Sequence, residues 1–126
     1  MFKFRQQHLD AFEVHVVALF TVRALAHVKA VWPAETAELG DEATEKIVRS
    51  ALQRATLFGF SSEYDVIRFV DLAFLLGTDF DTNHGVVWTR PILADRSLAP
   101  TAKMDKLYQR METEFALIEK RAVRRP

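Results

Sequence analysis

Hydrophobic residues recur every three or four positions over most of the chain, and this spacing predicts α-helices. The first predicted helix, about residues 6–31, carries two apolar rows. The main row consists of Leu9, Phe12, Val16, Leu19, Arg23, Ala26 and Ala30. The second row consists of Val17, Phe20, Ala24 and Val31. A helix that is apolar over so much of its circumference is expected to have neighbours on several sides, so we predict that it is the central helix.

Prolines, glycines and capping residues divide the rest of the chain into further helices. Pro33 ends the first helix, because the residue before a proline disfavours the helical conformation. Asp41 and Ser62 are predicted N-caps, and Gly59 and Gly77 are predicted to end helices in the left-handed conformation. The helices predicted after the first span residues 34–39, 41–58, 62–76, 88–93 and 101–123.

The prediction for residues 1–126 is one all-α domain, a bundle of four main helices plus short connecting helices. Only residues 85–88 have a strand-like pattern, and four residues are too few for a sheet. Hydrophobic residues make up 49% of the chain, enough to bury a core at this length. Since no apolar run approaches the roughly 20 residues of a spanning helix, we expect a cytoplasmic protein with no membrane contact.

Composition and motif spacing indicate a protein without an active site. The chain has no cysteine, and it lacks the serine nucleophile elbow, the glycine-rich phosphate loop and the zinc-binding histidine pair. We therefore predict no catalytic residue, no cofactor and no metal. The 17 basic and 17 acidic residues balance, which argues against a nucleic-acid partner, because such proteins carry net positive charge.

One loop keeps an alternative open. Asp79, Asp81 and Asn83 alternate like the first ligands of a calcium-binding EF-hand loop, but Arg90 stands at the twelfth position, where a bidentate glutamate is needed. The expected role of these side chains is to accept hydrogen bonds from backbone N–H groups. A hydrolase or metal enzyme that uses Asp79, Asp81 and His84 is the alternative reading.

Charged and apolar residues are also unevenly placed. An acidic patch is formed by Glu35, Glu38, Asp41, Glu42 and Glu45, whereas residues 120–125 are basic. Both are expected to be solvated helix faces, or else to steer a protein partner. In the predicted helix 62–76, some large residues lie off the main apolar face and are either buried by a second neighbour or exposed for binding. These residues are Ile67, Leu72, Phe74 and Leu75.

Part of the chain matches a known sequence pattern between Phe58 and Asp95. The matching residues are Phe58-Gly59-Phe60, Ser62-Glu63, Asp65-Val66, Arg68-Phe69-Val70, Leu72, Gly77, Asp79-Phe80-Asp81, Trp88 and Ile92-Leu93. This stretch resembles a family of small helical proteins encoded beside type VI secretion effectors and adaptor chaperones. The family pattern reads roughly Y-G-I-x-x-E-x-D-V-x-R-F-I, G-x-D-F-D and P-W-A-x-x-I-L. This chain departs from it at Phe58, Val87 and Thr89.

The resemblance implies a non-enzymatic co-chaperone that joins an adaptor chaperone to hold or load a secreted effector. The residues expected to bind the partner are Phe80, Trp88, Asp79, Asp81, Phe74 and Ile92. Phe80 and Trp88 are the expected apolar anchors, facing the partner or tucked under the loop after Gly77. Asp65 and Arg68 are expected to fix that loop through Asp79 or Asp81, and Gly59 and Gly77 are expected to support the helix ends.

A second binding function is an immunity protein that neutralises a cognate toxin, for which the acidic patch is the expected contact. Sequence leaves self-association open.

Overall fold

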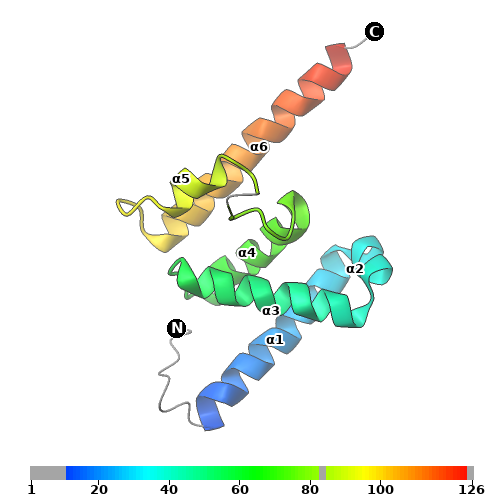
Figure 1. Ribbon diagram of the computed structural model, residues 1–126, viewed down its shortest axis with the longest axis vertical. Coiled ribbons are helices and arrows are strands. Elements are labelled where there is room, and N and C mark those ends of the chain that lie inside the picture. Colours follow the sequence, from blue (N-terminus) through cyan, green and yellow to red (C-terminus); the bar gives the residue numbers. More distant parts are fainter. Residues whose placement is uncertain (1–10, 83–84, 125–126) are drawn as a thin grey trace.

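The structure, a computed structural model, describes residues 11–82 and 85–124, and in those ranges all regular structure is helical (Figure 1). The helices are α1 (Ala11–Val31), α2 (Pro33–Leu39), α3 (Asp41–Leu57), α4 (Glu63–Leu76), α5 (Thr89–Leu93) and α6 (Pro100–Arg124). The all-α fold is thus confirmed, and the strand-like residues 85–88 form no strand. The predicted helical residues before Ala11 lie outside the described ranges.

Helix ends follow local chemistry, with one exception. The Ser62 hydroxyl accepts a hydrogen bond from the Asp65 backbone N–H at 3.1 Å and so caps α4 as predicted. Gly59 and Gly77 have φ values of 90° and 112°, a region that side chains disfavour. Asp41 is not an N-cap, because Gly40 occupies that position. Asp41 instead begins α3, with its carboxylate 3.1 Å from the Lys29 Nζ.

The central helix is α4, which contacts α1, α3 and α6 (Figure 1). Its fully buried apolar residues are Val66, Phe69, Val70, Leu72 and Ala73. Of the residues predicted off its main face, Leu72 is buried, and the other three are half-buried against the core. Since α4 is covered on more than one side, the prediction that the first helix is the central one is wrong.

Helix α1 uses its second apolar row for the core. Phe20 and Ala24 of that row, with Val28, are buried. The main row of the sequence prediction faces outward in the described part of the helix: Leu19 is 45% exposed, and Ala26 and Ala30 are also exposed. The row with the more regular spacing is therefore the row that the fold leaves uncovered.

The two longest helices project from opposite ends of the molecule. In Figure 1, α1 extends away from α4 at one end, and the last turns of α6 extend away from α4 and α5 at the other. No helix among residues 11–82 and 85–124 combines the length and the apolarity that crossing a membrane requires.

Candidate functional site

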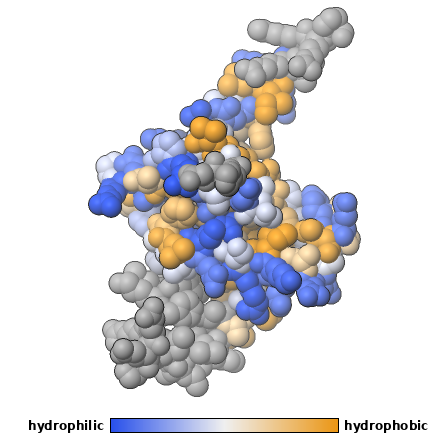
Figure 2. All heavy atoms as spheres, in the orientation of Figure 1, coloured by the Kyte–Doolittle hydropathy of each residue, from blue (hydrophilic) through white to orange (hydrophobic). Residues whose placement is uncertain are grey.

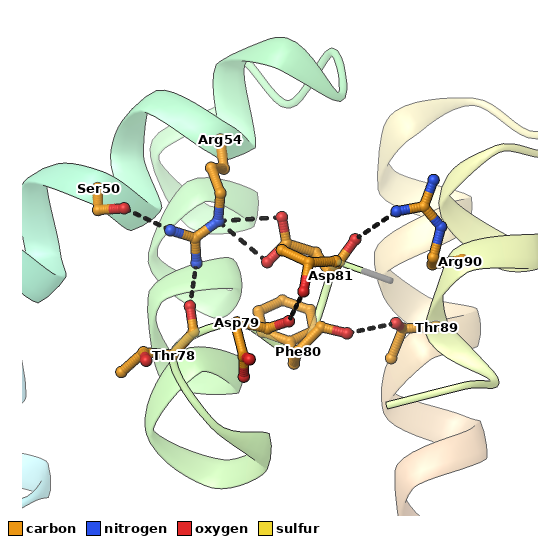
Figure 3. Close-up of polar contacts among 9 residues, drawn as sticks. Ser50, Arg54, Thr78, Asp79, Phe80, Asp81, Thr89 and Arg90 are labelled. Carbon is orange, nitrogen blue, oxygen red and sulfur yellow. Dashed lines mark hydrogen bonds and ion pairs between the residues drawn. The ribbon is translucent and has the colours of Figure 1, made fainter. Parts of the chain in front are cut away.

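The loop that follows α4 is held in place by Arg54, which projects from the last turn of α3 (Figure 3). The Arg54 Nε lies 3.0 Å from both carboxylate oxygens of Asp81, and the Nη2 donates to the Thr78 carbonyl oxygen at 2.6 Å. The Asp81 side chain is almost fully buried. Such charge-assisted bonds are stronger and better defined than neutral ones, so this guanidinium fixes the path of the loop.

The second half of the loop closes over Phe80. The Phe80 carbonyl oxygen accepts from the Val86 N–H at 3.1 Å and from the Thr89 hydroxyl at 2.7 Å. A Cβ on Gly85 would lie 2.2 Å from the Asp79 carbonyl oxygen. Because no side chain fits at that distance, the loop can close only with a glycine at this position.

Three of the six residues predicted to bind a partner are buried inside the molecule. Phe80 is 0% exposed, with its ring centroid 4.9 Å from that of Phe69, and Asp81 and Ile92 are also buried. A side chain without exposed surface cannot contact another protein unless the loop opens. Of the two placements expected for Phe80, the structure has the ring tucked under the loop, whereas Asp81 and Ile92 are buried where a partner contact was expected.

The other three residues differ in their surroundings. Phe74 is half-buried and stacks on Trp32 at a centroid distance of 6.0 Å. Trp88 is half-buried beside α6, with the Arg110 guanidinium 5.7 Å from its ring centroid. Asp79 is exposed. A binding role for these three residues remains a prediction, although both aromatic rings already have partners within the chain.

Asp65 and Arg68 hold α6, not the loop after Gly77. The Asp65 carboxylate accepts from the Thr101 hydroxyl at 2.7 Å, and the Arg68 Nη1 lies 2.9 Å from the Asp105 carboxylate. Burial, together with the negative charge of Asp71, raises the pKa of Tyr108, so its hydroxyl stays protonated and donates to the Arg68 carbonyl oxygen at 3.0 Å. The prediction that Asp65 and Arg68 fix the loop is wrong.

Arg54 fixes the loop in the way expected of Arg68, although no pattern in the sequence distinguishes Arg54. Because cations stabilise helix C-termini, a basic residue is expected in the last turn of a helix even when it contacts nothing outside that helix. The position of Arg54 therefore gives no sign of its contact with the loop. No spacing between Arg54 and Asp81 marks them as a pair, because they are 27 residues apart and on different elements.

The structure also bears on the metal-site alternative. Both Asp81 carboxylate oxygens accept from Arg54, so a cation at Asp81 would have to displace a guanidinium. Asn83 and His84 lie outside the described residues. Within residues 11–82 and 85–124, no three histidine or acidic side chains are placed to hold a metal ion together.

Helix α1 is fixed against α4 by a polar cluster on its inner side. The His27 Nε2 lies 2.8 Å from the Asp71 Oδ1, and the Trp32 Nε1–H donates to the same oxygen at 3.2 Å. One turn before His27 along α1, the Arg23 Nε lies 2.7 Å from the Glu63 carboxylate. These bonds fix the rotation of α1 and thereby determine which residues it presents to solvent.

The residues so presented form the outer seam of α1, which we define as Leu19, Val22, Ala26 and Ala30. All four are exposed, and Leu19 and Val22 are 45% and 62% exposed. They lie three or four residues apart, so they share one face of the helix. An uncharged row of this kind is what one helix offers another for packing.

Comparison of the chain with family models, with curated protein sequences and with solved structures finds no significant match.

Proposed function

We propose that this protein is a non-enzymatic co-chaperone that joins an adaptor chaperone to hold or load a type VI secretion effector, and that it docks through the outer seam of α1. The observation that carries the docking role is the exposure of an apolar row with regular helical spacing on a helix whose other face is already packed. The class of partner rests on the sequence resemblance between Phe58 and Asp95.

The shape of the outer seam favours a helix as the contacting element. Leu19 and Val22 supply large side chains at one end, whereas Ala26 and Ala30 allow a partner backbone to approach closely at the other. Helices pack at axial distances of about 8–10 Å, and small side chains give the shorter value. A partner helix with large apolar residues opposite the alanines would fill this surface.

Charges beside the outer seam are already neutralised within the chain. Arg23 pairs with Glu63, and Lys29 pairs with Asp41. A partner therefore gains little by bringing its own charges, since exposed ion pairs contribute only about 0–1 kcal/mol. Affinity would come from burying the apolar row, with Leu19 and Val22 as its main contacts.

The test is co-purification of the tagged chain with each neighbouring gene product after co-expression. The double variant Leu19→Glu/Val22→Glu should lose a complex that the wild type forms. The control is Leu57→Glu, which places one such charge on a residue that is 84% exposed and lies on α3. Equal recovery of partner by the double variant and the control would refute docking through the outer seam.

Effector delivery and protection against the toxin, measured in cells with and without this chain, distinguish a co-chaperone from an immunity protein. A co-chaperone is needed for effector delivery and gives no protection, whereas an immunity protein rescues a cell that expresses the toxin. Three of the five acidic-patch residues already form ion pairs within the chain: Asp41 with Lys29, Glu42 with Lys46 and Glu45 with Arg49. Rescue of toxin-expressing cells by this chain alone would replace the proposed function with the immunity function.

A further inference from the structure

Helix α1 differs from α6 in having two apolar rows instead of one. The single row of α6 is buried at its start and exposed at its end; it consists of Met104, Leu107, Met111, Phe115 and Ile118. Figure 2 shows apolar residues gathered on the exposed end of this helix. Burial of a single row fixes the rotation of α6, whereas α1 could bury either of its rows against α4.

The two rows of α1 carry similar side chains. We call the buried row the inner row; it consists of Phe20, Ala24 and Val28. The outer seam likewise contains one larger residue, one valine and alanines. The hydrophobic effect is non-directional and scales with the apolar area removed from water, so it gives only a small preference for the inner row. Other contacts must select which row is buried.

The polar contacts of α1 with Asp71 belong to one rotation of the helix. The His27 Nε2 lies 2.8 and 3.0 Å from the two Asp71 carboxylate oxygens, and the Trp32 Nε1–H donates to one of them at 3.2 Å. The Asp71 side chain is only 18% exposed, and a carboxylate so far removed from water needs hydrogen-bond donors. A rotation that buried the outer seam would carry the His27 imidazole to the other flank of α1, out of reach of Asp71.

We infer that Asp71 is a positioning residue for the docking surface: its contacts with His27 and Trp32 select the rotation of α1 that exposes the outer seam. The inference rests on the proposed function, because it concerns the same seam, but the rotation itself is measurable without a partner. The Arg23–Glu63 pair adds less to this selection, because both side chains are more than half exposed. Hydrogen bonds to a charged group are stronger than neutral ones, so loss of Asp71 should shift the ratio of the two rotations at least about tenfold.

The test is thiol labelling of the isolated chain, which has no cysteine of its own. A single Val28→Cys reports exposure of the inner row, and a single Leu107→Cys reports exposure of the contact between α6 and the core; both native residues are 0% exposed. Asp71→Leu should speed labelling at position 28 at least about tenfold and leave position 107 unchanged. Labelling that is unchanged at position 28, or that speeds up equally at both positions, would overturn the inference, because Asp71 would then have no particular effect on α1.

Three further variants separate positioning from general stability. Asp71→Asn keeps an oxygen that can accept hydrogen bonds, so its labelling rate at position 28 should lie between those of the wild type and Asp71→Leu. His27→Ala removes the donor from α1 without altering α4 and should also speed labelling, which keeps the test valid where Asp71→Leu fails to fold. Tyr108→Phe is the matched control, since it removes a hydrogen bond between α6 and α4. A rate at position 28 that Tyr108→Phe raises as much as His27→Ala would contradict the inference.

Ala26→Leu distinguishes rotation of α1 from its detachment. Ala26 is exposed in the outer seam, so the added side chain gains burial only when the outer seam faces α4. In the Asp71→Leu chain it should speed labelling at position 28 several-fold further. No further increase would mean that α1 detaches without exchanging its rows, and the inference would fail.

Binding separates this inference from the proposed function. With the neighbouring gene product that co-purifies, Asp71→Leu should weaken binding in proportion to the fraction of chains that bury the outer seam. If labelling shows the exchange of rows but the affinity is unchanged, docking through the outer seam is refuted and positioning by Asp71 stands. If labelling shows no exchange, positioning by Asp71 is refuted whatever the affinity.

Discussion

The loop between α4 and α5 and the outer seam of α1 contrast in how much of their apolar surface the fold covers. The loop contains two aromatic and two acidic residues of the kind expected at an interface, yet Phe80 and Asp81 are buried and contact partners within the chain, and Trp88 is half-buried. The outer seam has only aliphatic residues of small or moderate size, and all four are exposed. In this small helical protein, the Phe80 ring of the loop packs into the core, whereas the aliphatic residues of the outer seam stay exposed on one face of α1.

The largest effect that separates the two regions is expected from Phe80→Ala. This change removes a fully buried ring that contacts Phe69, and such truncations cost about 3–5 kcal/mol of unfolding free energy. Urea unfolding followed by circular dichroism measures the loss. Val87→Ala, at a residue that is 87% exposed in the same loop, should change stability by less than about 0.5 kcal/mol. A Phe80→Ala chain of wild-type stability that fails only to bind would return the docking role to the loop.

Arg54→Met should have the next largest effect. It leaves the buried Asp81 carboxylate without its partner, and breaking a buried ion pair costs about 3–5 kcal/mol, with the lower end expected here because Arg54 is partly exposed. The double variant Arg54→Met/Asp81→Asn should recover part of that loss, because the unpaired charge is gone. The coupling between the two changes, measured by urea unfolding, should be clearly non-zero. Additive losses would mean that Arg54 does not hold the loop through Asp81.

Gly85→Ala should destabilise the chain by about 1–3 kcal/mol, the usual cost of forcing extra volume into a closed structure. Its Cβ would approach the Asp79 and Phe80 carbonyl oxygens at 2.2 and 2.5 Å, so the loop must open to accept it. Thermal unfolding measures the loss, and Gly59→Ala is the comparison, since nothing lies within 4 Å of a Cβ there and only the positive φ opposes it. A larger loss at Gly59 than at Gly85 would contradict the tight closure of this loop.

The smallest effect on stability is expected in the outer seam. Leu19→Glu and Val22→Glu replace exposed residues with good helix formers, so each should change the unfolding free energy by less than about 0.5 kcal/mol. Circular dichroism melting of the isolated chain checks this. A loss of several kcal/mol would show that the seam is covered within the chain itself.

Much of this fold could be predicted from sequence because the relevant signals are local. The Ser62 cap, the glycines with positive φ and the break at Pro33 each depend on a few neighbouring residues. Periodicity also predicts both apolar rows of α1. What periodicity cannot give is which row meets the rest of the chain, because both rows satisfy the same spacing.

The candidate site was less predictable for a related reason. Whether Phe80 is exposed depends on Arg54, Gly85 and Thr89, which converge on the loop from α3, the loop itself and α5. The sequence predicts that Asp65 and Arg68 contact the loop after Gly77, but their partners Thr101 and Asp105 lie on α6. Two residues that are distant in sequence have no characteristic spacing that would mark them as partners. Which residues form such pairs is determined by how the helices pack.

The most direct test of docking through the outer seam is the affinity of the purified chain for the proposed partner, the neighbouring gene product that it retains on co-expression, measured by titration calorimetry. We predict that Leu19→Glu/Val22→Glu weakens binding at least about thirtyfold, the loss of two interface residues worth more than about 1 kcal/mol each, while Leu57→Glu binds like the wild type. Binding that is unchanged in the folded double variant, or lost equally in the control, would contradict the account.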